Sequence, residues 1–385
     1  MINYKEIQDK YEFEVYPKRD ICIIKGKDAK LWDDKGNEYI DCIAGIGVAS
    51  VGHSNTEVAD AIAEQAHTLI TCPGVFYNDK RAQFMEKLVS LTSPELTKVF
   101  MTNSGTEAVE GALKAARLTT GKTDFIAAMK GFHGRSMGAL SATFKKTYRE
   151  PFNPLVPGFS FVPFNNFEKM AEAVTDKTAG IIIEPVQGEG GINIANNEYI
   201  KNVRRLCNQK NIIFILDEIQ SGFCRTGKMF AHQHFDVKPD ILTLAKAIGG
   251  GFPLGAFVCN NKIASMLGKH GTTFGGNPLA SAAGFAALKF MTDNNLAEMA
   301  REKGKYFVSK FKNIELTKVR EIRHLGLMIG IELKQKVKPI LEELMKEGIL
   351  ALPAGTTVLR LLPPLVIGYD ELDIVAEKLI KVLKD

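Results

Sequence analysis

Residues 98–260 alternate short apolar runs with helix-like segments, and this alternation limits the possible folds more than any other feature of the chain. The apolar runs are KVFMT, DFIAAM, AGIIIEPV, NIIFILDE, ILTLAK and GAFVC. Between them, residues 107–118 and 198–210 have the polar and apolar pattern of amphipathic helices. Continuous apolar strands connected by helices are typical of a mainly parallel sheet that is covered on both faces. The sequence therefore predicts an α/β fold.

The regions on either side of this core predict a second lobe. KLWDDKGNEYIDC, residues 30–42, alternates around a turn at 34–37, which indicates a hairpin. The last hundred residues combine helices with the strand-like segments GLMIGIEL (326–333) and VLRLLPPLVI (358–367). We expect a separate α+β lobe, because 385 residues are enough for two hydrophobic cores.

Composition narrows the classes of protein that this fold could represent. No apolar stretch approaches the ~18 residues that a membrane helix needs, and MINYKEIQDKYEFEVYP does not resemble a secretory signal. Six cysteines without a C-x-x-C pair, and dispersed histidines, predict neither disulfides nor a metal site. The net charge of +5 comes without a dense basic block, so we expect no nucleic-acid partner, although an acidic partner stays open. We expect a soluble, cytoplasmic protein.

Polar residues follow four of the predicted strands at their carboxyl ends. These are Ser104, Glu184, Asp217 and Lys246. Because ligands of such sheets bind outside the carboxyl ends of the strands, we expect these side chains to share one site.

Lys246 and Asp217 are the most informative of the four residues. Lys246 lies in TLAKAIGGG, and burial there would lower the pKa of its amine and make it a nucleophile. The alternative is an ordinary surface lysine. Asp217 ends a buried strand, so it either caps the next helix or meets a cationic ligand. Gln220 could point an amide into the same space.

The segment NSGTE allows two interpretations. Ser104 and Glu107 have the spacing of a capping box, which would make this an ordinary helix start. Gly105 and Thr106 could instead bind an anion at the helix N-terminus. A lysine, an anion site and a carboxylate at neighbouring strand ends are what pyridoxal phosphate requires.

Six ordered motifs carry a resemblance to a known family. They are NSGTEAVEGALKAAR, GFHGRS, EPVQGEGG, DEIQSGFCRTG, LAKAIGGGFPLGA and TTFGGNPLA. In order and wording they resemble the class III aminotransferases, especially acetylornithine aminotransferases and enzymes acting on carrier-linked lysine or ornithine. The resemblance implies the type I pyridoxal-phosphate fold, with a mainly parallel seven-stranded sheet in a large domain (50–276). A smaller α+β domain built from both termini (1–49 and 277–385) and a homodimer with shared active sites are also implied.

The resemblance assigns the cofactor contacts residue by residue. Lys246 would bind the cofactor aldehyde and move a proton, and Asp217 would keep the pyridine nitrogen protonated. Thr273 would reach the phosphate from the other subunit. The remaining cofactor-binding residues would be Ser104, Gly105, Thr106, Phe132, Glu184, Ile219 and Gln220.

Four further residues would select the substrate. Arg135 resembles the guanidinium that binds a substrate carboxylate. Arg360 matches the family's second arginine, which holds the α-carboxylate of glutamate, and Glu189 matches its partner when the other substrate is bound. Loop salt bridges or a solvated strand end would explain the same residues. Ile46 stands where ornithine aminotransferases carry tyrosine, which favours a substrate with a blocked α-amino group.

These observations predict a pyridoxal-phosphate aminotransferase of arginine or lysine biosynthesis. It would exchange the terminal amino group of an α-N-blocked ornithine or lysine with 2-oxoglutarate and glutamate. The blocking group would be acetyl or an acidic amino-group carrier protein. The alternatives are a 4-aminobutyrate or free ornithine aminotransferase, a semialdehyde aminomutase, and a non-catalytic protein that binds a phosphate ligand.

Overall fold

The computed structural model describes residues 2–384, and a seven-stranded sheet forms the centre of its larger body. The strand order is β4-β12-β11-β10-β7-β5-β6. Antiparallel pairing is confined to β12, which runs against both of its neighbours, whereas the other pairs are parallel. The strands are β4 (Leu96–Thr102), β5 (Asp124–Ala128), β6 (Phe159–Val162), β7 (Thr178–Ile183), β10 (Ile213–Asp217), β11 (Ile241–Leu244) and β12 (Gly255–Asn260). The predicted α/β class and mainly parallel sheet are confirmed.

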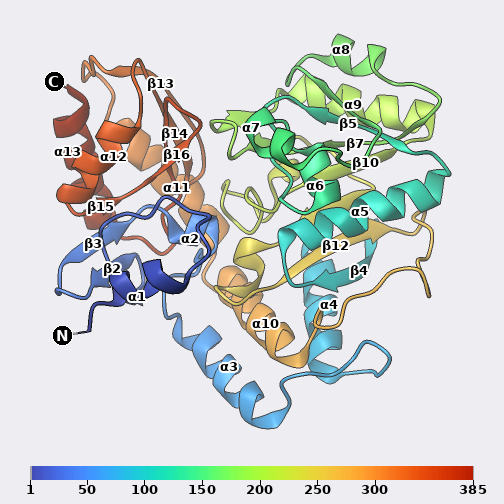
Figure 1. The fold of residues 1–385 in the computed structure, drawn as a ribbon, viewed down its shortest axis with the longest axis horizontal. Coiled ribbons are helices and arrows are strands. Elements are labelled where there is room, and N and C mark those ends of the chain that lie inside the picture. The colour runs from blue at the N-terminus through green and yellow to red at the C-terminus, as the bar shows by residue number, and fades with distance from the viewer. Residues whose placement is uncertain (1, 385) are drawn as a thin grey trace.

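The sheet is buried on both faces, which explains its continuous apolar strands. In β7, Ile182 belongs to an apolar cluster with Val109 of helix α5 (Gly105–Thr120). Ile181 and Ile183 belong to the opposite cluster, which includes Ile200 of α9 (Asn197–Lys210). Successive strand residues point to opposite faces, so both must be apolar here. Figure 1 shows α5 lying over one face of the sheet, where it contacts β12 and β11.

The smaller body contains two four-stranded sheets, and one of them joins distant parts of the chain. Its order is β1-β2-β3-β15, with β15 parallel to β3, whereas the other sheet has the order β13-β14-β17-β16. N-terminal and C-terminal elements accordingly lie together in Figure 1. The strands are β1 (Ile23–Lys27), β2 (Lys30–Asp33), β3 (Glu38–Asp41), β13 (Val319–Leu325), β14 (Met328–Leu333), β15 (Ile349–Leu350), β16 (Leu352–Ala354) and β17 (Val358–Leu361).

The predicted hairpin at residues 30–42 is confirmed. Strands β2 and β3 pair antiparallel with Trp32 opposite Glu38, and Gly36 in the turn has a φ of 85°. The domain boundaries at 49/50 and 276/277 stay a prediction.

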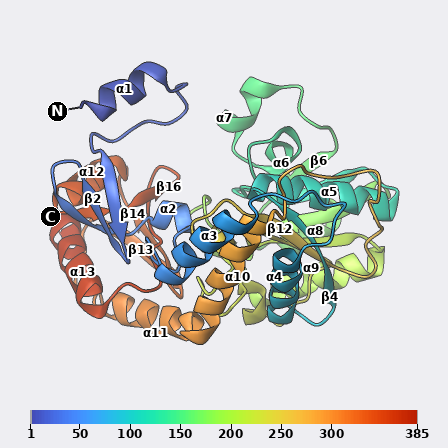
Figure 2. The same ribbon diagram turned by 90° about the horizontal axis from the view of Figure 1, so that it is seen from below.

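Helices cover both bodies and connect them. Figure 2 shows α10 and α11 running between the bodies, with α1 at the edge of the smaller one. No helix within residues 2–384 is long and apolar enough to cross a membrane. The remaining helices are α1 (Tyr4–Tyr11), α2 (Ala44–Gly47), α3 (Thr56–Thr68), α4 (Asp79–Leu91), α6 (Met137–Ala142), α7 (Lys146–Arg149), α8 (Phe167–Glu172), α10 (Pro278–Asp293), α11 (Leu296–Ser309), α12 (Lys338–Lys346) and α13 (Tyr369–Lys384). Short 3₁₀ turns and a two-stranded ribbon complete the chain: η1 (Glu150–Phe152), η2 (Ala231–His234), η3 (Lys246–Gly249), β8 (Val186–Gln187) and β9 (Asn193–Ile194).

Candidate active site

A cavity of about 460 Å³ lies at the carboxyl edge of the parallel strands. It brings together most of the residues that the sequence analysis selected. Those lining it are Ser104, Gly105, Thr106, Phe132, Arg135, Glu184, Glu189, Asp217, Ile219, Gln220 and Lys246. The four predicted strand-end residues therefore share one site.

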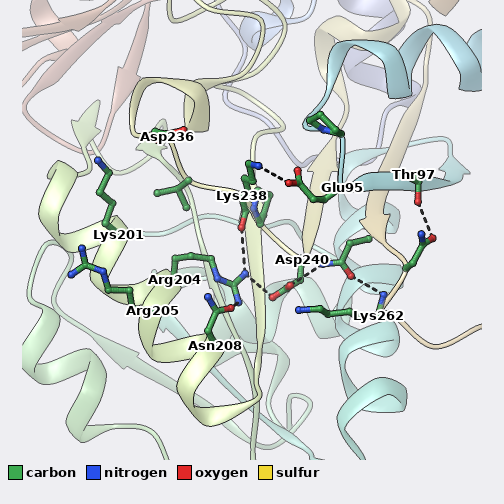
Figure 3. Close-up of a pocket in the computed structure, with 15 residues that line it drawn as sticks. Glu95, Thr97, Lys201, Arg204, Arg205, Asn208, Asp236, Lys238, Asp240 and Lys262 are labelled. Carbon is green, nitrogen blue, oxygen red and sulfur yellow. Dashed lines mark hydrogen bonds and ion pairs between the residues drawn. The ribbon is translucent and has the colours of Figure 1, made fainter.

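A second cavity, of about 650 Å³, lies at the opposite edge of the sheet, where Asp240 precedes β11 (Figure 3). Several of its charged side chains pair with one another. Arg204 Nη1 lies 2.7 Å from Asp240 Oδ2, and Lys238 Nζ lies 2.5 Å from Glu95 Oε1. None of the predicted site residues lines it. The cavity at the carboxyl edge is thus the candidate active site.

Lys246 projects into the candidate site from a strained turn after β11. Its φ is 51°, in the left-handed region that non-glycine residues rarely occupy, and such strain is common at functional sites. Burial lowers the pKa of its amine to about 8, with Arg360 adding to the decrease and Glu189 opposing it. No side chain or carbonyl within residues 2–384 forms a hydrogen bond with the amine. The amine is therefore free to react.

The Asp217 carboxylate is held by the backbone of Ile219 and by His133, a residue to which the sequence analysis gave no role. One carboxylate oxygen accepts a hydrogen bond from the Ile219 N–H at 3.1 Å, and the other lies 2.7 Å from His133 Nδ1. Burial lowers the pKa of His133, but the hydrogen bond and charge of Asp217 outweigh burial and raise it above the usual value. His133 Nε2 is buried without a partner among the described residues. His133 lies within GFHGRS, and nothing in that segment of the sequence indicates that its imidazole contacts Asp217.

Glu184 lines the cavity and connects two loops. Its carboxylate accepts hydrogen bonds from the N–H groups of Phe132 at 3.0 Å and Gly188 at 3.2 Å. Burial raises its pKa to about 7, with the negative charge of Asp217 adding to the increase and His133 opposing it. Glu184 thus fixes the backbone that presents Phe132.

The N-terminus of α5 combines the capping box with an anion cradle, so the two sequence interpretations are compatible. Ser104 Oγ accepts from the Glu107 N–H at 3.4 Å, and Glu107 accepts from the Ser104 N–H at 3.1 Å. The N–H groups of Gly105 and Thr106 precede the first intrahelical donor and have no partner inside the helix. A Cβ on Gly105 would lie 2.8 Å from Ile219 Cδ1, so a larger residue at this position would require the Ile219 side chain to move.

Two residues that the sequence analysis did not select support this cradle. Thr106 Oγ1 lies 2.6 Å from Ser136 Oγ, and Ser136 in turn donates to Glu110 at 2.7 Å. Glu110 also accepts from the N–H groups of Gly138 and Ala139. Glu110 lies one helical turn after Thr106, so helix spacing could have indicated it.

Arg360 and Glu189, paired in the sequence analysis, are in contact. Arg360 Nη1 donates to Glu189 Oε1 at 2.5 Å and to Gln220 Oε1 at 3.2 Å. The arginine is only 2% exposed, whereas the Glu189 side chain is 32% exposed. Glu189 is therefore the partner closer to solvent, and its departure would leave a buried guanidinium without a counter-ion, which another carboxylate could replace.

Three predicted residues do not line this cavity: Arg360, which contacts the lining residues Glu189 and Gln220, and Ile46 and Thr273. The structure does not bring Ile46 and Thr273 to the site. Ile46 has a φ of 69° and is 43% exposed, and the neighbouring Val48 lines the cavity instead. Thr273 lies in an exposed segment. The proposed roles of both residues stay predictions.

The described residues fit pyridoxal phosphate. Gly105 leaves space beside Ile219 at the anion cradle, and the buried Asp217 carboxylate faces the cavity together with the reactive Lys246 amine. Together with the mainly parallel sheet, this arrangement defines a type I pyridoxal-phosphate enzyme. Residues 14–383 match the family model described as aminotransferase class-III, and the chain belongs to this family, whose members use pyridoxal phosphate.

Comparisons with individual proteins agree with the family. The chain is 48% identical over 383 residues to the LysW-aminoadipate semialdehyde transaminase of Deinococcus radiodurans, with 98% of this chain and 89% of that protein covered. It is 45% identical over 381 residues to the acetylornithine aminotransferase of Methanocaldococcus jannaschii, with 96% and 95% covered. The structure of Toxoplasma gondii ornithine aminotransferase, with partial occupancy of pyridoxal phosphate at its active site, superposes with a TM-score of 0.94 at 32% identity, covering 99% and 93%.

Proposed function

We propose that this aminotransferase moves the terminal amino group of an α-N-blocked ornithine or lysine to 2-oxoglutarate. The products are the corresponding semialdehyde and glutamate, and the enzyme would serve arginine or lysine biosynthesis. The contact of Glu189 with Arg360 carries the proposal, because a removable carboxylate lets one pocket accept both an ω-amine and a dicarboxylate. The names of the Deinococcus and Methanocaldococcus relatives support this substrate class.

Each side chain would have a defined task. When bound, pyridoxal phosphate supplies an aldehyde that binds amines covalently and a ring that withdraws electrons from the adjacent carbon. Lys246 Nζ would carry the proton that leaves the substrate carbon, since its lowered pKa favours the neutral base. Asp217 would hold a proton at the ring nitrogen, and His133 would orient its carboxylate. The cradle of Gly105 and Thr106 would hold the phosphate.

Two arginines would bind the substrate carboxylates, and one of them would distinguish the substrates. Arg135 would bind the carboxylate that lies remote from the reacting amine in both substrates. Arg360 would bind the α-carboxylate of glutamate after Glu189 moves away, and it would stay paired with Glu189 while the ω-amine is bound. A semialdehyde aminomutase interconverts one substrate and has no use for such a pair.

A homodimer would complete the site. Thr273 would reach the phosphate of the partner subunit, because it lies in an exposed segment outside its own cavity. Large apolar side chains are exposed near it, including Phe274 at 61%, Phe76 at 63% and Val75 at 84%. Exposed apolar surface of this kind is typical of protein interfaces.

A single-turnover absorbance experiment tests the substrate class. The cofactor-loaded enzyme is mixed separately with N-acetylornithine, free ornithine and 4-aminobutyrate, and conversion of the pyridoxal form to the pyridoxamine form is followed. Rapid conversion by N-acetylornithine alone is expected for a blocked substrate. Fast conversion by 4-aminobutyrate or ornithine, with little response to N-acetylornithine, would contradict the proposal. No response to all three, with normal conversion by glutamate, would indicate a carrier-linked substrate.

The carrier alternative has its own electrostatic test. A net charge of +5 would attract an acidic carrier protein, and such attraction weakens as salt screens the charges. We therefore expect the rate constant with carrier-linked substrate to fall as salt is added, while the rate with glutamate changes little. A salt-independent rate would contradict electrostatic recognition of the carrier.

A further inference from the structure

Arg135 lies at the candidate site with its hydrogen-bond donors unused. No carboxylate or carbonyl group within residues 2–384 accepts a hydrogen bond from it. Its Cζ instead lies 3.5 Å from the ring centroid of Tyr148 and 5.6 Å from that of Phe132. A guanidinium stacked on an aromatic face keeps its in-plane N–H groups free for a carboxylate. The ring therefore restrains Arg135 without occupying its donors.

The Tyr148 ring is itself held in place by Lys145. Lys145 Nζ donates to Tyr148 Oη at 3.2 Å and lies 4.3 Å from the ring centroid. The Tyr148 N–H donates to the Lys145 carbonyl at 3.0 Å, which fixes the start of α7. Phe132 meets the ring edge-on, with centroids 6.4 Å apart and planes at 86°.

Backbone contacts tie the Tyr148 segment to the loop that carries Arg135. The Phe144 N–H donates to the Gly131 carbonyl at 3.0 Å. The His133 N–H donates to Thr143 Oγ1 at 2.9 Å, and that hydroxyl donates to the Gly134 carbonyl at 3.2 Å. The stacked pair therefore belongs to one interconnected loop structure beside the cavity.

We propose that Tyr148 is a positioning residue that holds Arg135 ready for the carboxylate remote from the reacting amine. This inference deepens the proposed function and rests on its assignment of Arg135. An exposed arginine loses side-chain freedom when it binds a ligand, and prior stacking on Tyr148 reduces that loss. Tyr148 thereby favours substrates that carry the second carboxylate.

The test compares glutamate with norvaline, which has the same carbon chain but lacks the side-chain carboxylate. In the half-reaction of the cofactor-loaded enzyme, Tyr148→Leu is expected to raise the half-saturating glutamate concentration about 3- to 30-fold. The limiting rate should stay nearly unchanged, because the lost interaction serves binding. Norvaline should show no change. Tyr148→Phe keeps the aromatic face and the contact of Lys145 with the ring but loses the hydrogen bond to Oη, so its half-saturating glutamate concentration should change much less than that of Tyr148→Leu.

Three results would overturn the inference. The first is an equal loss of glutamate and norvaline turnover, which indicates a general structural role. The second is an undiminished effect of Tyr148→Leu in an Arg135→Met background, because residues acting through one contact are not additive. The third is an unchanged glutamate response in Tyr148→Leu. If that variant does not fold, Tyr148→Met is measured against the same criteria.

A second substrate pair separates this inference from the proposed function. N-acetylornithine and N-acetyl-1,4-diaminobutane differ only in the carboxylate, so Tyr148→Leu should impair the former selectively. A wild-type enzyme that responds to 4-aminobutyrate or free ornithine but not to N-acetylornithine would contradict the proposed substrate. The glutamate and norvaline comparison would still decide the role of Tyr148, because it does not depend on the ω-amine.

Discussion

At the residue scale, burial has opposite effects on the acids and bases of the site. It lowers the pKa of Lys246 to about 8 and raises that of Glu184 to about 7. Both shifts favour the neutral form, as expected for groups removed from water. The Asp217 carboxylate is paired with His133, whose Nδ1 lies 2.7 Å from one of its oxygens. Sequence position alone could not reveal this contact, since the two residues are 84 positions apart.

The lowered pKa of Lys246 predicts unusual reactivity in the cofactor-free protein. Only the neutral amine is nucleophilic, so the labelling rate of Lys246 with a small amine-reactive reagent should increase with a midpoint at a pH of about 8. The midpoint of an ordinary lysine lies at ~10.4. Peptide mass mapping across a pH series measures this. Glu189→Gln should move the Lys246 midpoint lower, because the Glu189 charge raises that pKa. A Lys246 profile matching those of ordinary surface lysines would contradict the prediction.

At the element scale, the hydrogen bonds at the start of α5 predict how two substitutions change the free energy of unfolding. Glu107 accepts the Asn103 N–H at 2.6 Å and the Ser104 N–H at 3.1 Å, whereas the reverse contact to Ser104 Oγ is 3.4 Å. Glu107→Ala should therefore lower the free energy of unfolding by about 1–2 kcal/mol, and Ser104→Ala by about 0.5–1 kcal/mol. Urea unfolding at equal protein concentration measures both.

The matched control for this prediction is Glu57→Ala. Glu57 is the acidic first-turn residue of α3. The capping hydrogen bond of that helix does not involve Glu57, because Asn55 Oδ1 accepts from the Val58 N–H. Its loss should change the free energy of unfolding by no more than about 0.5 kcal/mol. A Ser104→Ala variant less stable than Glu107→Ala would show that the capping hydroxyl dominates.

The larger elements and most site residues could be predicted because strong local patterns specify them. Apolar runs indicated six strands of the large sheet, and Asp217 and Lys246 stood out as charges at strand ends. The seventh strand, β6, has only four residues, FSFV, at the sheet edge and gives a weak signal. His133 and Tyr148 act through contacts set by tertiary structure. Their neighbours in the sequence therefore gave no indication of those contacts.

At the whole-molecule scale, a buried arginine connects segments that are far apart in sequence. Arg225 is 1% exposed, and it donates to the carbonyls of Leu327 and Pro363 and to Ser50 Oγ. Burial lowers its pKa to about 9, with the charge of Asp41 opposing the decrease. These contacts fix the loop after Asp217 against segments from both ends of the chain. The geometry of the site therefore depends on long-range packing as well as on the sheet.

The proposed dimer predicts that subunit association and cofactor affinity are coupled. Arg81 donates to the carbonyls of Cys72, Phe76 and Gly276, so the exposed apolar loop around Phe76 adjoins the segment of Thr273. Phe76→Glu should place a charge in the interface and yield monomers. A monomer would lack the proposed contact of Thr273 with the phosphate of the cofactor in the partner subunit. The affinity for the cofactor should therefore fall about 10- to 100-fold.

Sedimentation velocity and cofactor absorbance, measured on the same samples, test this coupling. Thr273→Ala should weaken cofactor binding without dissociating the dimer, because it removes one phosphate contact and leaves the apolar surface intact. Ile374→Glu is the matched control: Ile374 is 44% exposed on α13, far in sequence from the loops joined by Arg81, and its change should alter neither property. A monomeric Phe76→Glu variant that keeps wild-type cofactor affinity would show that each subunit holds its cofactor alone.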